Sequence, residues 1–91
     1  MIYELLFTKK AEEDIKKLKK SDPTAFKKLE KLLLELMEHP YIGSGNPELL
    51  KHNLAGLYSR RISKKHRLIY AVNDTEIIVT VISARDHYDD K

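Results

Sequence analysis

The sequence predicts an α+β fold of two layers, in which an α-helical hairpin packs on one face of an antiparallel β-sheet. Three observations support this: a short apolar run at the start, two adjacent segments with helical spacing after it, and β-branched runs after a Gly- and Pro-containing loop. The element order is β-α-α-β-β-β, and the N-terminal strand joins the same sheet as the others. With 91 residues, the chain is expected to be a single domain, residues 1–91.

The first strand is predicted at residues 2–7, because the run IYELLF is short, apolar and contains aromatic residues. Thr8 can cap the helix that follows, which ends near Lys20. The apolar residues of this helix recur at helical spacing: Ala11, Ile15 and Leu18.

A second helix restarts at Ser21-Asp22-Pro23, where Asp22 or Ser21 caps and Pro23 fits the first turn. Pro40 ends it. One apolar stripe runs along it: Phe26, Leu29, Leu32, Leu33, Leu36 and Met37. Two helices joined by so few residues are expected to form an antiparallel hairpin.

Residues 41–50 are predicted to be a loop, because they contain two Gly and one Pro. The chain after this loop is predicted to form three strands and a polar tail: residues 57–62, 67–72, 76–84 and 86–91. Because the helices cover only one face of the sheet, the other face is open to carry a site.

Composition is that of an ordinary globular protein, with 42% hydrophobic and 34% charged residues and a net charge of +3. No apolar run approaches the roughly 20 residues that span a membrane, and the N-terminus lacks a signal-peptide pattern. The absence of cysteine suits a reducing compartment. A cytoplasmic location without membrane association is therefore expected.

The positive charge is concentrated in one stretch. Residues 49–73 contain six Lys or Arg, two His and no acidic residue. Such a stretch attracts phosphates, which favours a nucleic-acid partner. The alternative is a solvated basic face with no partner.

Three arginines lie in or beside predicted strands. By strand alternation, Arg61 points to one face of its strand and Arg60 to the other. If the following turn has three residues (63–65), Arg61 lies opposite Arg67; if it has four, the two point to opposite faces. The alternative to a functional role is that these are solvated edge-strand residues that discourage aggregation.

Glu48 is the only acidic residue between Glu38 and Asp74, and it directly precedes the basic stretch. A carboxylate among cations stays ionised and can accept a proton from a hydroxyl. Its structural alternative is an ion pair with Lys51 or Arg67.

His87 follows the last predicted strand and precedes Tyr88, so it can donate a proton near neutral pH at the edge of the open face. His52 and His66 lie in the basic stretch, and two alternatives are open for them: a contact with phosphate, or no functional contact. The chain has no cysteine, no HExxH motif and no close histidine pair, so neither a metal site nor a cofactor is predicted.

One reaction would use these residues together. Metal-free RNA cleavage needs a base for the 2′-hydroxyl, cations for the phosphorane, and an acid for the leaving 5′-oxygen. Glu48 can supply the base and His87 the acid. Arg67, with Arg61 and Lys51, can supply the cations.

The segment from Gly43 to Val72, GSGNPELLKHNLAGLYSRRISKKHRLIYAV, closed by His87-Tyr88, closely resembles the YoeB/Txe branch of RelE-type bacterial toxins. The family pattern G-x-G-x-P-E-x-L-K-H-x-L-x-G-x-x-S-R-R-I-x-x-x-H-R-L-x-Y-x-V is present at every fixed position. The resemblance implies a RelE-like fold and an endoribonuclease (mRNA interferase) that enters the ribosomal A site, cuts mRNA and inhibits translation. It also implies a cognate antitoxin, YefM/Axe-like, that wraps the toxin.

By matched position, the resemblance implies Glu48 as general base, His87 as general acid, Tyr88 as an aligning residue, and a phosphate contact by Arg67. The implied substrate-binding residues are Lys51, His52, Arg61 and His66. The sequence departs from many members by residues 89–91, which follow the His-Tyr pair and add two carboxylates.

Two other functions compete with this one. The first is a non-catalytic ParE-like toxin acting on DNA gyrase, against which the presence of both Glu48 and His87 argues. The second is a plain basic RNA-binding module, which would bind in a salt-sensitive way without cleavage. A homodimer is compatible with the sequence, but no residue marks its interface.

Overall fold

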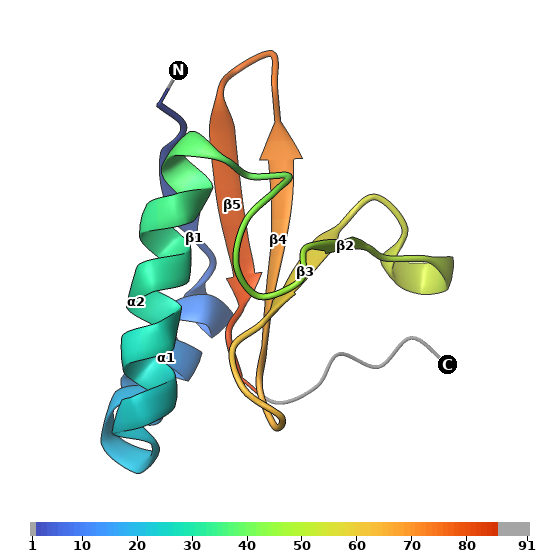
Figure 1. The fold of residues 1–91 in the computed structure, drawn as a ribbon. Helices are drawn as coiled ribbons and strands as arrows, with labels where there is room; N and C mark the ends of the chain where they lie inside the picture. Colours follow the sequence, from blue (N-terminus) through green and yellow to red (C-terminus); the bar gives the residue numbers. More distant parts are fainter. Residues whose placement is uncertain (1, 86–91) are drawn as a thin grey trace.

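The computed structural model describes residues 2–85, which form one five-stranded sheet with two helices on one of its faces (Figure 1). In chain order the elements are β1 (Glu4–Phe7), α1 (Lys9–Ser21), α2 (Pro23–Glu38), β2 (Glu48–Leu49), the 3-10 helix η1 (His52–Leu54), β3 (Tyr58–Arg61), β4 (Arg67–Asn73) and β5 (Ile78–Ser83). The predicted two-layer α+β fold is confirmed. Within the described range, no helix is both long and apolar enough to cross a membrane.

The sheet has the strand order β1-β5-β4-β3-β2, and two of its features correct the sequence prediction. β1 pairs with β5 in parallel, so the sheet is mixed rather than antiparallel. Both strands run toward the end of the sheet where α1 begins, and there the Thr8 hydroxyl donates to the Ile82 carbonyl at 2.7 Å. The second correction is β2, a two-residue strand inside the segment predicted to be a loop.

Local capping residues set the helix boundaries as predicted. The Thr8 hydroxyl accepts a hydrogen bond from the third residue after it, and the Asp22 carboxylate does the same for α2. Pro23 occupies the first turn of α2, where its missing N–H costs no hydrogen bond. α2 ends at Glu38, two residues before Pro40.

The hydrophobic core lies between the helices and the sheet. Its fully buried members come from both layers: Ala11, Leu18, Leu29, Leu32, Leu36, Leu68, Tyr70, Val79, Val81 and Ala84. Burying one large aliphatic side chain of this kind stabilises the fold by about 1.5–3 kcal/mol. One buried acid is also present: Asp14 of α1 accepts from the Ala84 N–H at 3.2 Å and so ties the helix to the end of β5.

Three segments distant in sequence are joined by one carboxylate. The hydroxyls of Tyr3 and Tyr41 donate to the two oxygens of Asp74, each at 2.6 Å. These bonds connect the N-terminal segment, the loop after α2 and the turn between β4 and β5. The bonds from Tyr3 and then Tyr41 lower the pKa of Asp74, and the bond to Asp74 raises the pKa of Tyr41.

This carboxylate is expected to make stability depend on acid pH. Because its folded-state pKa lies below the ordinary value of 3.8, its contribution is present above that value and is lost as the pH falls through the folded-state pKa. In urea unfolding, the wild type should therefore be more stable than Asp74→Asn at pH 6, with the difference shrinking below about pH 4. A variant carrying both Tyr3→Phe and Tyr41→Phe should behave like Asp74→Asn. If the wild type exceeded Asp74→Asn in free energy of unfolding by the same amount at pH 3 as at pH 6, this assignment would be contradicted.

Candidate active site

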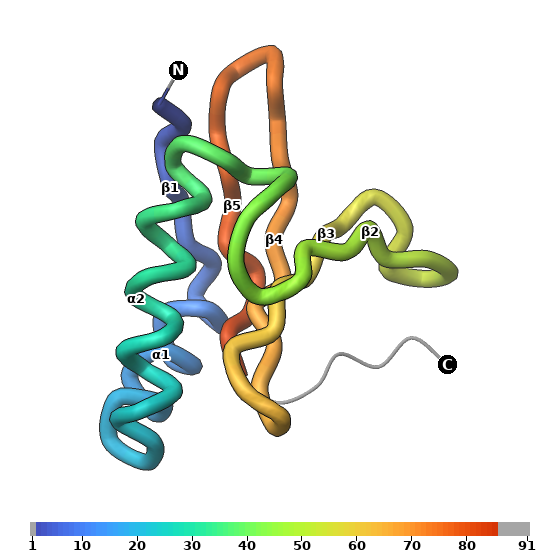
Figure 2. The backbone as a smooth tube through the Cα atoms, in the orientation of Figure 1, coloured from blue at the N-terminus to red at the C-terminus, as the bar shows by residue number. Residues whose placement is uncertain are grey.

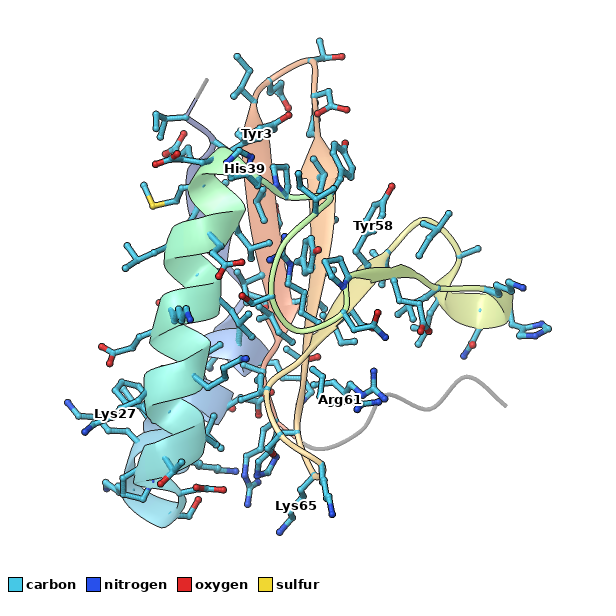
Figure 3. All side chains as sticks on the ribbon, in the orientation of Figure 1. Tyr3, Lys27, His39, Tyr58, Arg61 and Lys65 are labelled. Atoms are coloured by element: carbon cyan, nitrogen blue, oxygen red, sulfur yellow. The ribbon has the colours of Figure 1, made fainter. Side chains whose placement is uncertain are left out.

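The pairing of β2, β3 and β4 determines which side chains share the face of the sheet away from the helices. Arg60 contacts α2, so its neighbours Ser59 and Arg61 point to the opposite face. Glu48 lies opposite Ser59 on the neighbouring strand. The carboxylate of Glu48 and the guanidinium of Arg61 therefore project from the same face, and Figure 3 shows Arg61 extending away from the helices.

The turn between β3 and β4 decides whether Arg67 joins this face. The Ile62 N–H donates to the His66 carbonyl at 3.0 Å, which leaves residues 63–65 as the turn. This is the three-residue alternative, and Arg61 accordingly lies directly opposite Arg67. Both arginines project from the face away from the helices, on which Ser59 and Ile69 are nevertheless buried.

Glu48, Arg61 and Arg67 form what we call the Glu-Arg-Arg face. Side chains directly opposite on antiparallel strands have Cβ atoms about 4.5–5.5 Å apart, and diagonal neighbours such as Glu48 and Arg61 are about 7–8 Å apart. Glu48 and Arg61 are exposed, and Arg67 is half-buried. Two like charges placed opposite each other are unfavourable unless an anion lies near both. The arrangement suits a phosphate held by two guanidinium groups beside a carboxylate.

The remaining predicted residues are distributed unevenly. Lys51 and His52 are exposed and lie at the start of η1, which projects beyond the edge of the sheet (Figure 1). His66 has only 3% of its surface exposed and lies opposite Ile62, a core residue, so the structure does not bring it to the Glu-Arg-Arg face. His87 and Tyr88 lie outside the described residues.

Sequence reasoning missed the role of Arg60, whose guanidinium is fully buried behind the Glu-Arg-Arg face. Its hydrogen bonds go to the Glu35 carboxylate (3.1 Å), the Tyr70 hydroxyl (3.2 Å) and the backbone carbonyls of His39, Ile42 (2.9 Å) and Ser44 (3.3 Å). Three of these acceptors belong to the loop that leaves α2 and crosses the sheet on its way to β2 (Figure 2). The alternation rule, which placed Arg60 and Arg61 on opposite faces, was the available signal.

Glu35 of α2, which is half-buried, completes this group. Besides Arg60, it accepts the Ser44 N–H at 2.8 Å. The Ser44 bond is the main cause that lowers the pKa of Glu35, and the charge of Arg60 acts in the same direction. The carboxylate therefore stays ionised at neutral pH and anchors both the loop and the arginine.

Two glycines let the loop pack closely on this group. A Cβ at Gly43 would lie 2.5 Å from a carboxylate oxygen of Glu35, and one at Gly45 would lie 2.9 Å from the Arg61 carbonyl. Both have positive φ, +126° and +81°. The second glycine of the G-x-G motif therefore has a packing explanation, because no side chain fits between Gly45 and β3, whereas a side chain at Gly43 would displace the Glu35 carboxylate or the Arg60 guanidinium.

Gly45→Ala is expected to destabilise the protein more than Gly56→Ala. Both positions have positive φ, +81° and +92°, but an added Cβ at Gly56 would meet no atom within 4 Å. The two substitutions thus share the backbone strain and differ in the contact with β3. The free energy of unfolding should fall by about 1–3 kcal/mol more for Gly45→Ala, the usual cost of over-packing, in urea titrations. Equal losses would show that the close approach costs nothing.

Comparison with known proteins gives consistent matches. Residues 7–88 match the family described as "YoeB-like toxin of bacterial type II toxin-antitoxin system". Toxin YoeB of Escherichia coli K12 is 37% identical over 84 residues, which covers 92% of this chain and 98% of that protein. Toxin YoeB of Synechocystis is 36% identical over 84 residues, with coverage of 92% and 95%.

Solved structures agree with these matches. The YoeB/ParE toxin from Agrobacterium tumefaciens superposes with a TM-score of 0.86 at 33% identity, covering 93% of this chain and 99% of that one. The YoeB dimer from Staphylococcus aureus gives 0.82 at 37% identity, covering 97% and 100%. YoeB in a heterotetrameric YoeB-YefM complex from the same organism gives 0.80 at 37% identity, also covering 97% and 100%.

Proposed function

The chain belongs to the YoeB-like toxins of bacterial type II toxin–antitoxin systems, and on that basis we propose that it is an endoribonuclease that cuts mRNA on the ribosome. The observation that carries this proposal is the Glu-Arg-Arg face, where Arg61 lies opposite Arg67 and Glu48 stands on the neighbouring strand. A binding module for RNA needs the cations only. The carboxylate beside them supplies a proton acceptor, which cleavage at a 2′-hydroxyl requires.

The proposed reaction has one displacement step. Glu48 takes the proton from the ribose 2′-hydroxyl, and the 2′-oxygen attacks the adjacent phosphorus. The bond from phosphorus to the 5′-oxygen of the next nucleotide breaks, and His87 gives that oxygen a proton. Arg61 and Arg67 stabilise the extra negative charge on the phosphorane. The products are a 2′,3′-cyclic phosphate and a 5′-hydroxyl.

Other groups hold the substrate in this proposal. The RNA backbone is contacted by Lys51 and His52, which are both exposed at the start of η1, beyond the edge of the sheet. Tyr88 aligns the substrate next to His87. His66 makes no direct RNA contact in this proposal, because its side chain is buried.

We also propose the partners of this toxin. The similar protein from Staphylococcus aureus occurs as a YoeB dimer and in a YoeB-YefM complex. By that likeness, a YefM-like antitoxin binds and inactivates this chain in the cytoplasm, and two copies form a homodimer. A basic face suits an acidic, partly disordered segment that folds on binding.

The test is cleavage of a defined mRNA on purified ribosomes. We expect cut mRNA whose downstream fragment carries a 5′-hydroxyl and whose upstream fragment carries a 2′,3′-cyclic or 3′-phosphate. A parallel assay follows supercoiling by DNA gyrase. Intact mRNA together with lost supercoiling would reject the nuclease and favour the ParE-like alternative. Intact mRNA with salt-sensitive RNA binding would leave only a binding module.

A further inference from the structure

We infer that Arg60 is a positioning residue for the proposed cleavage. From the side of the sheet that faces the helices, it holds the loop of residues 39–47 in place, so that Glu48 and Arg61 contact the same phosphate. The catalytic part of this inference rests on the proposed function. The structural part, that Arg60 organises the loop, rests on the hydrogen bonds of its guanidinium alone.

Arg60 organises the loop through its guanidinium. Its two terminal nitrogens donate to the carbonyls of His39, Ile42 and Ser44, which span most of this loop. Glu35 adds a second hold on Ser44 through the Ser44 N–H. A lysine in place of Arg60 would keep the charge but has only three donors on one nitrogen, so it could not reproduce the planar fork.

The loop is also bound to the backbone of Arg61. The Gly45 carbonyl accepts the Arg61 N–H at 2.6 Å, so the loop lies along the edge of β3. Arg60 and Arg61 are adjacent, and their side chains leave the strand on opposite faces. The Arg60 side chain, which points toward the helices, therefore holds the same loop that Arg61 binds through its backbone N–H.

The loop leads directly into Glu48. Only Asn46 and Pro47 separate the anchored Gly45 from Glu48. The Pro47 ring restricts its own φ, which removes freedom from that short connection. β2 is two residues long, so its pairing with β3 is a weak constraint by itself. The position of the Glu48 carboxylate thus depends on the anchored loop.

The experiment measures kcat and KM for ribosome-bound mRNA together with the exchange rate of the Arg61 amide. Arg60→Lys is the principal variant, with Glu35→Ala and the conservative Glu35→Gln as a second series. The matched control is Leu18→Ala, a fully buried position in α1 that belongs to neither the loop nor β3. All variants are assayed below their melting transitions.

We expect kcat of Arg60→Lys to fall about 10- to 100-fold, as displacement of catalytic groups by about 1 Å can cause, with a smaller change in KM. Arg61 amide exchange should accelerate. Glu35→Gln should retain more of the rate than Glu35→Ala, because it keeps a hydrogen-bond acceptor for Arg60 and Ser44. Leu18→Ala, though destabilised, should keep the wild-type kcat.

Unchanged kcat and unchanged Arg61 exchange in a folded Arg60→Lys would overturn the inference. So would an equal fall of kcat in Leu18→Ala, since general destabilisation would then explain both. If the wild type itself leaves mRNA intact, the proposed function fails. In that case the Arg61 amide decides whether Arg60 organises the loop: faster exchange supports it, and unchanged exchange rejects it.

Discussion

Replacing Glu48 by Gln is expected to slow mRNA cleavage by about 10²- to 10⁴-fold, the usual contribution of a general base. Gln has nearly the same size, but its amide cannot take a proton from the 2′-hydroxyl. Because Glu48 is exposed, the free energy of unfolding should change by no more than about 0.5 kcal/mol. Single-turnover cleavage on purified ribosomes and a thermal melt of the same preparation measure the two quantities.

The matched control is Glu30→Gln, which makes the same chemical change at an exposed position of α2. It should cleave at the wild-type rate. If Glu48→Gln also cleaves at that rate, Glu48 is not the base, and the Glu-Arg-Arg face serves for binding only.

Arg60→Met is expected to have the largest effect on stability. Arg60 is fully buried and donates several hydrogen bonds, and each buried acceptor left without its donor costs about 1–3 kcal/mol, whereas the Glu35 side chain is 25% exposed and can regain water. The acceptors of Arg60 include the Glu35 carboxylate and three backbone carbonyls. For a domain of this size, the melting temperature should fall by about 12 °C or more.

Arg61→Met provides an internal comparison, because it makes the same change one residue later in an exposed side chain. Its free energy of unfolding should stay within about 0.5 kcal/mol of the wild type. Calorimetry of both variants tests the difference. Similar melting temperatures would mean that the buried guanidinium contributes no more than a surface arginine.

Sequence reasoning correctly predicted the structural features that local chemistry determines. Both helices begin and end where capping and proline rules place them, with Thr8 and Asp22 as N-caps and Pro40 beyond the end of α2. The three-strand meander was also predicted, because β-branched runs separated by polar turns have few other interpretations. These features need no knowledge of distant neighbours.

Sequence reasoning was less accurate where contacts between distant parts of the chain determine the structure. β2 was missed because two residues following Pro47 carry no periodicity. The parallel orientation of β1 depends on how the helical hairpin returns the chain to the sheet, which no local pattern encodes. Whether Arg61 and Arg67 would share a face depended on the length of one turn, as did the pairing of His66 with Ile62.

The candidate site was predicted in part for the same reason. Shared faces follow from strand alternation and one turn length, so Arg61 and Arg67 could be placed together once the three-residue turn was established. The roles of His87 and Tyr88 fall outside the described residues and stay predictions. Strand alternation indicates that Arg60 and Arg61 face opposite ways, but the partners of Arg60 could not be foreseen, because most of its acceptors are backbone carbonyls of a loop.

The brevity of β2 has a consequence for how this protein responds to heat. Glu48 is the first of only two residues that pair with β3, at the edge of the sheet, whereas the core residues of β4 and β5 lie between other strands. Edge segments with few hydrogen bonds open locally at a lower free-energy cost than the whole domain unfolds. Warming should therefore abolish cleavage reversibly at temperatures where circular dichroism still reports a native fold, and cooling should restore it.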